Sequence, residues 1–230
     1  MGRMADPTAE MRFYLEWIRD AVGPFLPADG PPEPAERGAG DAPAAARLAA
    51  MAEEVAVCRR CGLCEGRKQT VFGEGSPSPR LVVVGEAPGA EEDRTGRPFV
   101  GRAGELLTRM LLAIGLSRAD VFICNVLKCR PPNNRSPRPD EVAACRPYLD
   151  AQVEVLRSPL LLALGSHAAR LLLRTEQGIT RLRGRFHTTP EGWRVMPSFH
   201  PAYLLRNPAA KREAWEDLKQ VASELGLAIP

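Results

Sequence analysis

Short apolar runs recur along the chain after residue 80, and polar residues, glycines or prolines follow each of them. Four runs have the length of buried strands: Leu81–Val84, Val121–Ile123, Leu160–Leu164 and Val195–Phe199. A continuous apolar run of this length between turn residues is typical of a strand that is buried on both faces. The pattern therefore predicts parallel strands inside one sheet.

Helical periodicity separates the predicted strands. Apolar residues recur at spacings of three and four within residues 106–114, 142–156, 168–172 and 214–225. Such spacing gives a helix one apolar face, which it buries against a neighbouring layer. Strands that alternate with helices indicate an α/β fold, in which a parallel sheet carries helices on both faces.

The first 44 residues differ from the rest of the chain. Asp6 and Pro7 are suited to begin a helix, and the apolar residues between Met11 and Val22 fall on one helical face. Residues 24–43 are rich in Pro, Gly, Ala and acidic residues, which is typical of a flexible linker. We therefore predict an N-terminal extension over residues 1–44 and one domain over residues 45–230. The predicted helix can pack on that domain or on a protein partner.

Composition and charge narrow the functional classes. No apolar run reaches the roughly 18–20 residues of a membrane helix, and charged residues interrupt the N-terminus where a signal peptide needs an apolar core. We expect a cytoplasmic monomer that does not bind membranes. Residues 1–44 carry a formal charge of −4 and residues 45–230 carry +7. A basic domain suits a polyanionic partner, although the charge alone favours a solvated basic surface.

Polar residues suited to catalysis or ligand binding follow the predicted strands. The segment Gly85-Glu86-Ala87-Pro88-Gly89 comes directly after the first strand, Asn125 follows the second, and His200 follows the last. Open α/β sheets bind ligands at the carboxyl ends of their strands. We therefore predict a site where these segments meet. His167 and His187 lie outside every motif, and we interpret both as structural or surface residues.

Six cysteines offer a second candidate site. In a reducing compartment they favour a metal, a cluster or buried thiols over disulfides. Cys58 and Cys61 form a CxxC pair that Cys64 extends, and Cys129 and Cys145 lie far downstream. Spacing alone leaves zinc, an iron–sulfur cluster and no metal open, because a zinc ribbon has a second CxxC pair. Cys124 lies within an apolar strand and is interpreted as a core residue.

These motifs together resemble one known family. The chain is similar to the family 4 uracil-DNA glycosylases, the iron–sulfur members of the uracil-DNA glycosylase superfamily. The resemblance covers residues 58–215. It depends on Cys58-x-x-Cys61, Gly85-Glu86-Ala87-Pro88-Gly89, Arg97-Pro98-Phe99-Val100-Gly101, Asn125-Val126-Leu127-Lys128-Cys129-Arg130-Pro131-Pro132, Cys145 and His200-Pro201-Ala202-Tyr203-Leu204-Leu205-Arg206-Asn207. It implies a three-layer α/β/α sandwich with a central four-stranded parallel sheet, in agreement with the strands predicted above.

The resemblance also implies roles for individual residues. Phe99 matches the aromatic residue that stacks on a flipped uracil, and Asn125 matches the amide that reads the uracil edge. Gly85, Glu86 and Ala87 match the loop at the pocket. Glu86 and His200 are the expected catalytic residues, with His200 facing uracil O2. Ala87 replaces the acidic, water-activating residue of other superfamily members, which leaves the general base unassigned.

The cofactor and the DNA contacts follow from the same resemblance. Cys58, Cys61, Cys129 and Cys145 match the ligands of a 4Fe-4S cluster, whereas Cys64 matches none. The segment from Pro201 to Arg206, expected to be a loop, matches the part that enters the minor groove. The expected DNA-binding residues are Arg130, Arg135, Arg138, Leu205 and Arg206.

The implied function is DNA base-excision repair. A monofunctional hydrolase would flip deoxyuridine out of single- or double-stranded DNA, cleave its N-glycosidic bond, release uracil and leave an abasic site. Two alternatives remain: a superfamily relative that acts on another damaged base, and a non-catalytic iron–sulfur module that binds DNA. The set of Glu86, Asn125 and His200 argues against mere binding, which needs no pocket for a base.

Overall fold

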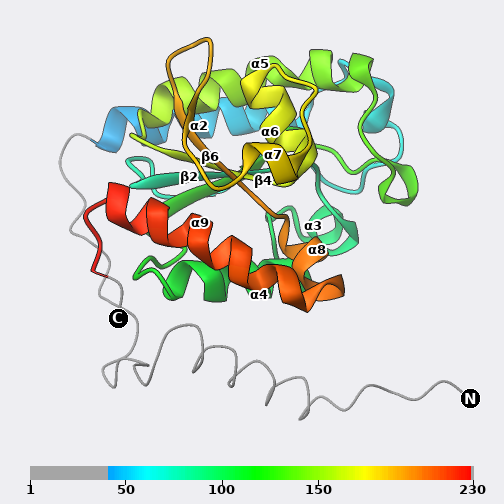
Figure 1. Cartoon of the computed structure of the whole chain (residues 1–230). Helices are drawn as coiled ribbons and strands as arrows, with labels where there is room; N and C mark the ends of the chain where they lie inside the picture. The colour runs from blue at the N-terminus through cyan, green and yellow to red at the C-terminus, as the bar shows by residue number, and fades with distance from the viewer. Residues whose placement is uncertain (1–40, 229–230) are drawn as a thin grey trace, which may run out of the picture.

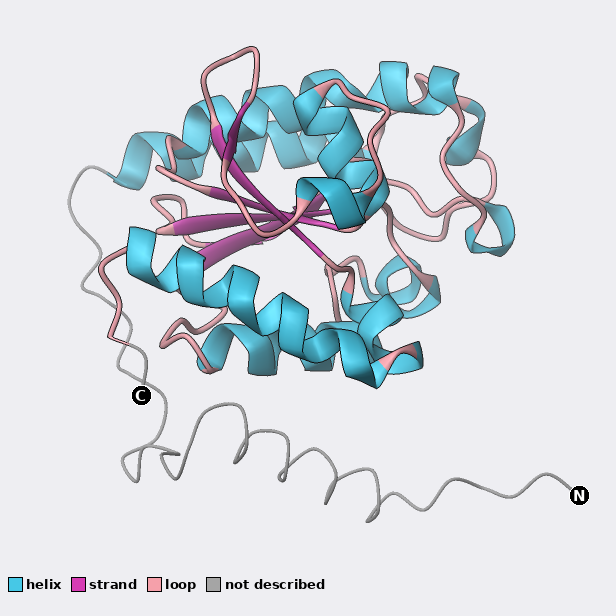
Figure 2. Cartoon of the chain, viewed as in Figure 1, coloured by secondary structure: helices cyan, strands magenta, loops and turns pink. Residues whose placement is uncertain are grey.

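The computed structural model describes residues 41–228, which form an α/β/α sandwich (Figure 1, Figure 2). The strands are β1 (Glu74–Gly75), β2 (Leu81–Gly85), β3 (Val121–Asn125), β4 (Leu161–Leu164), β5 (His187–Thr188) and β6 (Arg194–Ser198). The helices are α2 (Asp41–Ala56), α3 (Ala90–Thr95), α4 (Arg102–Leu112), α5 (Pro139–Leu156), α6 (Ser166–Leu173), α7 (Ile179–Leu182), α8 (Pro201–Arg206) and α9 (Lys211–Glu224).

The sheet has the strand order β1-β3-β2-β4-β6-β5. Its four central strands are parallel, and each lies within two residues of the apolar run that predicted it. The parallel four-stranded core is therefore confirmed. The two edge strands, β1 and β5, were not predicted; each has two residues and pairs antiparallel with its neighbour.

Successive residues of β2 serve two separate cores. Leu81 and Val83 pack with the apolar faces of α4 and α9, whereas Val82 and Val84 pack with those of α2 and α5. This alternation follows from the two-residue period of a strand. Figure 1 shows the resulting layers, with α4, α8 and α9 on one face of the sheet and α2, α5 and α6 on the other.

Two sequence expectations change at this stage. Helix α2 begins at Asp41, so the last three residues of the predicted linker are helical. The segment from Pro201 to Arg206, expected to be a loop, is helix α8, which His200 caps. The predicted N-terminal helix lies outside the described residues, and the proposed domain boundary near residue 44 stays a prediction. No helix within residues 41–228 has the length and apolarity needed to cross a membrane.

Candidate functional site

The predicted site residues meet at the carboxyl edge of the parallel sheet. Gly85 ends β2 and pairs in register with Asn125, which ends β3. His200 follows β6 by two residues. This arrangement results from the parallel order of the strands, which brings their carboxyl ends to one edge. The sheet therefore assembles residues that are more than a hundred positions apart in the chain.

Gly85 allows Asn125 and Phe99 to approach the backbone. A Cβ atom on Gly85 would lie 2.3 Å from Asn125 Oδ1 and 2.6 Å from Phe99 Cζ. Phe99 is buried and has a φ of 51°, a left-handed conformation that is uncommon for residues other than glycine. Arg118 holds this backbone, because its guanidinium donates to Phe99 O over 3.1 Å and to Pro98 O over 2.8 Å. The ring and the amide are thus fixed side by side.

Asn125 carries an unsatisfied acceptor. The residue is 1% exposed, and no donor within the described residues reaches its Oδ1 atom. Its backbone oxygen accepts from Lys128 Nζ over 2.8 Å, and Lys128 also donates to Gln152 Oε1 over 2.5 Å. A buried polar atom without a partner costs about 1–3 kcal/mol, so this orphaned oxygen indicates a ligand group that donates to it.

His200 presents one defined tautomer to the site. The backbone N–H of Ala202 donates to Nδ1 over 3.1 Å, so the proton of the neutral ring resides on Nε2. Burial lowers the pKa of His200 to about 4, although Glu86 acts in the opposite direction. The imidazole is therefore a neutral hydrogen-bond donor at pH 7. Its ring lies 5.6 Å from the ring of Phe99, centre to centre.

A cavity of about 440 Å³ opens between these residues. Its walls come from the loop after β2, the Phe99 segment, the end of β3 and α8. It is lined by Glu86, Ala87, Pro88, Gly89, Glu92, Phe99, Ala103, Asn125, Asn134, Arg135, His200, Ala202, Tyr203 and Arg206. The volume suits a small molecule or a single nucleotide.

Two carboxylates line this cavity, and they differ in their surroundings. Glu92 accepts hydrogen bonds from the backbone N–H groups of Val100, Gly101 and Gly89, so it braces the loops. Glu86 instead forms an ion pair with His167, with 2.9 Å between Oε2 and Nδ1. The sequence interpretation left His167 outside the site, because no motif surrounds it. The structure places it against Glu86, which lines the cavity.

The predicted DNA-binding residues do not form one group. Arg206 and Arg135 line the cavity, but Arg135 is held by Glu141, with 2.9 Å from Nη1 to Oε2. Arg130 and Arg138 are not among the lining residues, and Arg130 Nε donates to the Asn134 side chain over 2.7 Å. The arginines thus spread over the segment around η2 (Pro132–Asn134), the N-cap of α5 and the end of α8.

Helix α8 exposes a different apolar residue from the expected one. Leu205 is partly buried and packs against the core. Tyr203 is 38% exposed, lines the cavity and lies 5.0 Å from the ring of Phe199. Helical geometry explains the difference, because residues two positions apart lie on different faces. Sequence analysis missed Tyr203 because it treated the segment as a loop.

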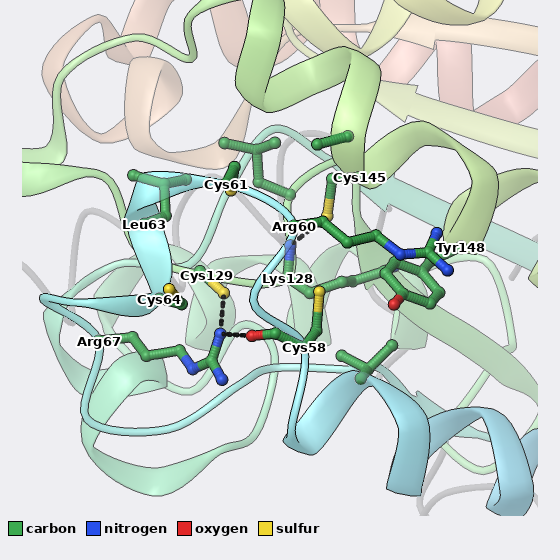
Figure 3. Close-up of a pocket in the computed structure, with 13 residues that line it drawn as sticks. Cys58, Arg60, Cys61, Leu63, Cys64, Arg67, Lys128, Cys129, Cys145 and Tyr148 are labelled. Atoms are coloured by element: carbon green, nitrogen blue, oxygen red, sulfur yellow. Dashed lines mark hydrogen bonds between the residues drawn. The ribbon is translucent and has the colours of Figure 1, made fainter.

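A second pocket gathers the cysteines. One space between η1 (Gly62–Cys64), the segment after β3 and helix α5 is lined by Cys58, Cys61, Cys64, Cys129 and Cys145 (Figure 3). All six cysteines are free, and Cys124 is buried within β3 as expected. Within the described residues, no three Cys, His, Asp or Glu side chains gather tightly enough to hold a single metal ion.

Two of these thiols accept hydrogen bonds, one from an arginine side chain and one from the backbone. Arg67 Nη1 donates to Cys129 Sγ over 3.3 Å and to Cys58 O over 2.8 Å, and it joins two distant parts of the chain (Figure 3). The backbone N–H of Lys128 donates to Cys145 Sγ over 3.3 Å. Burial raises the pKa of Cys129 to about 11, and the Arg67 hydrogen bond opposes that rise. This pocket suits a group that binds thiolates.

Comparison with known proteins gives a consistent result. The family model described as the Uracil DNA glycosylase superfamily matches residues 72–219. The chain is 47% identical to a type-4 uracil-DNA glycosylase of Thermotoga maritima, over 75% of this chain and 92% of that protein. It is 44% identical to the type-4 enzyme of Saccharolobus solfataricus, over 76% and 85% of the two chains. A type-5 uracil-DNA glycosylase of Mycobacterium leprae is 31% identical over 76% and 89%.

Proposed function

This chain belongs to the type-4 uracil-DNA glycosylases of the uracil DNA glycosylase superfamily, DNA-repair hydrolases that act on N-glycosyl bonds, and we propose that its 440 Å³ cavity receives a uracil flipped out of DNA. A base inside a duplex is out of reach of such a cavity, so it must leave the stack at a cost of a few kcal/mol. Hydrolysis then releases uracil and leaves an abasic site.

The observation that carries this proposal is the orphaned Oδ1 of Asn125 beside Phe99. Uracil offers an N–H donor at N3 and an oxygen acceptor at O4. The Asn125 amide matches both, because its oxygen accepts from N3 and its NH₂ donates to O4; cytosine presents the reverse pattern. Stacking on Phe99 returns roughly 1–3 kcal/mol of the unstacking cost. Recognition thus uses two side chains that contact Gly85.

His200 serves the departing base. Cleavage leaves negative charge on uracil, and a fixed N–H donor in a dry cavity stabilises such charge. The neutral ring with its proton on Nε2 is suited to donate to uracil O2. The imidazole needs no change of protonation state for this role, since the pKa of His200, about 4, lies well below 7.

Glu86 serves the sugar side. Bond cleavage builds positive charge on the deoxyribose, and a nearby carboxylate offsets that charge or orients the attacking water. Ala87, beside it, has no side chain for proton transfer. Glu92 is already engaged with three backbone N–H groups. Among the carboxylates that line the cavity, Glu86 is therefore the candidate for this role.

The cysteine pocket fits a 4Fe-4S cluster held by Cys58, Cys61, Cys129 and Cys145. A single zinc ion holds all its sulfurs at about 2.3 Å, whereas each cysteine of a four-iron cluster binds a separate iron. These four cysteines line one pocket, which supports a group bound by several thiolates. When bound, the cluster cross-links η1 to the segment that presents Arg130 and Arg135.

The remaining features of the proposal concern partners. We infer that the protein acts as a monomer in the cytoplasm on single- or double-stranded uracil-containing DNA. Six free cysteines support a reducing compartment. Residues 1–40 lie outside the described part, and a protein partner for the helix predicted there stays a prediction.

The test uses an oligonucleotide with one uracil, treated with the protein and then with hot alkali, which cuts abasic sites. Strand scission should require the alkali, and free uracil should appear in equal amount. An oligonucleotide with cytosine at that position is the control, and one with hypoxanthine tests the alternative substrate. If protein with an intact cluster yields no strand scission on any uracil substrate, the glycosylase function is wrong and the DNA-binding module replaces it. Asn125→Asp should weaken uracil recognition, because a carboxylate cannot donate to O4.

A further inference from the structure

Glu86 separates two cavities. The uracil cavity lies on one side of it, and a second cavity of about 390 Å³ lies on the other. The walls of the second cavity come from α5, α6 and the segments that flank them. They comprise Glu86, Val126, Pro137, Pro139, Val142, Arg146, His167, Arg170, Leu171, Arg174, Thr175 and Glu176. A side chain in this second cavity can therefore act on Glu86 without contacting the base.

His167 is the residue that does so. It is the second residue of α6, which begins directly after β4 and Gly165. Its Nδ1 atom lies 2.9 Å from Glu86 Oε2. The side chain of Glu86 is 31% exposed and that of His167 is 47% exposed. At this exposure, packing does not hold either side chain in one conformation, so the contact between them matters.

We propose that His167 is a positioning residue of the glycosylase reaction, which holds the Glu86 carboxylate at the wall of the uracil cavity from the far side. The inference rests on the proposed function of that cavity. A glutamate side chain has several accessible rotamers, and freezing them costs free energy. A partner that selects one rotamer before the substrate arrives raises the fraction of productive complexes.

The strength of this contact depends on the proton of His167. The hydrogen bond to Glu86 raises the pKa of His167, while partial burial and Arg170 act in the opposite direction. The other charged groups that line the same cavity are Arg146, Arg174 and Glu176. Protonation of His167 adds the attraction between opposite charges to its hydrogen bond with the Glu86 carboxylate. Glu86 should therefore be held most firmly below the pKa of His167 and less firmly above it.

The two histidines near Glu86 thus have different roles. The partly buried His200 is neutral at pH 7 and lines the uracil cavity, whereas the exposed His167 gains its proton more readily and lines the second cavity. Opposite pKa shifts in neighbouring groups are a common way to divide tasks within one site. His167 contacts Glu86 and none of the reacting atoms, so its effect should be on the rate of the bond-breaking step.

The test compares three variants on the uracil oligonucleotide. His167→Phe keeps a ring but removes the donor, and it should lower kcat about tenfold with KM unchanged. His167→Asn restores an N–H near the Nδ1 position and should recover most of the rate. The control is His187→Asn, which changes a histidine of β5 that is bonded to Leu182 O and lines neither cavity. It should behave as the wild type.

Two further measurements separate positioning from a structural role. The single-turnover rate of the wild type should fall as pH rises through the pKa of His167, and this alkaline limb should vanish in His167→Asn. By NMR, the pKa of His167 should drop in Glu86→Gln, a readout that needs no catalysis. A changed KM with unchanged kcat in His167→Phe, or an unchanged pKa of His167 in Glu86→Gln, would overturn the proposal. Uracil release by the wild type would still support the proposed function in that case. Absence of uracil release by the wild type would overturn both.

Discussion

Replacing Gly85 by alanine tests the geometry of the uracil cavity most directly. The added Cβ would lie 2.3 Å from Asn125 Oδ1, 2.6 Å from Phe99 Cζ and 2.7 Å from Phe99 Cε2. Nonbonded heavy atoms pack at about 3.5 Å, so the amide and the ring must each retreat by about 1 Å. One methyl group would thus displace both side chains that are proposed to read and stack the base.

The structure limits how this strain can relax. Phe99 is buried, and Arg118 holds its backbone. Helix α4 packs closely behind Phe99, because a Cβ on Gly104 would lie 1.8 Å from Phe99 O. Overpacking of such a site costs about 1–3 kcal/mol of folding stability. A displacement of about 1 Å in reacting geometry can lower a rate about 10²-fold, and we expect a loss of this size in kcat/KM for Gly85→Ala.

The assay is single-turnover excision of uracil from an oligonucleotide, with thermal unfolding measured in parallel. The matched control is Gly178→Ala, because a Cβ on Gly178 meets only Thr180 Oγ1, at the ordinary contact distance of 3.9 Å. That protein should retain wild-type activity. The Gly85→Ala protein should fold, keep its affinity for DNA without uracil and lose excision.

Wild-type excision by a folded Gly85→Ala protein would refute the reasoning. It would mean that Asn125 and Phe99 tolerate a shift of about 1 Å, so neither their contact with Gly85 nor their exact placement would matter for uracil recognition. A protein that unfolds before it loses activity would instead show that the contact serves the core. In that case, the smaller change Phe99→Leu would test stacking separately.

The remaining predictions concern the cluster, the DNA contacts, the N-terminal extension and the histidine. Cys129→Ser should lose iron and soluble protein whereas Cys64→Ser keeps its iron, and stoichiometric zinc without iron in anaerobically purified protein would contradict the cluster. Arg206→Ala should weaken DNA binding across sequences and reduce the slope of log K against log salt by about one unit; an unchanged slope would remove this contact. Deleting residues 1–40, which stops before α2, should leave turnover unchanged, and a large loss in a folded protein would assign the extension to the site. Burial lowers the pKa of His200 from 6.5 to about 4, so its contribution to stability is complete above pH 6.5 and is lost as pH falls toward 4. The free energy of unfolding of wild type minus that of His200→Ala should therefore decrease between pH 7 and pH 4.5 in denaturant titrations, and a constant difference would contradict the shift.

Several elements could be predicted because their signals are local. The four parallel strands are continuous apolar runs, and their boundaries were correct within two residues. Elements with weak or short signals were missed. Helix α2 contains eight alanines, which reduce the contrast between its faces, and β1 and β5 have two residues each, too few to show any period. Helix α8 has only six residues, begins with a proline and could not be distinguished from a loop.

The sequence by itself determined which residues follow the strands and therefore that Gly85, Asn125 and His200 belong to one edge of the sheet. Only the tertiary structure decided what touches what at that edge. Three features depend on side chains from separate elements. They are the pairing of Glu86 with His167, the exposure of Tyr203 and the close approach of Asn125 and Phe99 to Gly85. Local patterns record the period and burial of one segment, whereas contacts across a sheet edge depend on strand order and on distances that no single segment contains.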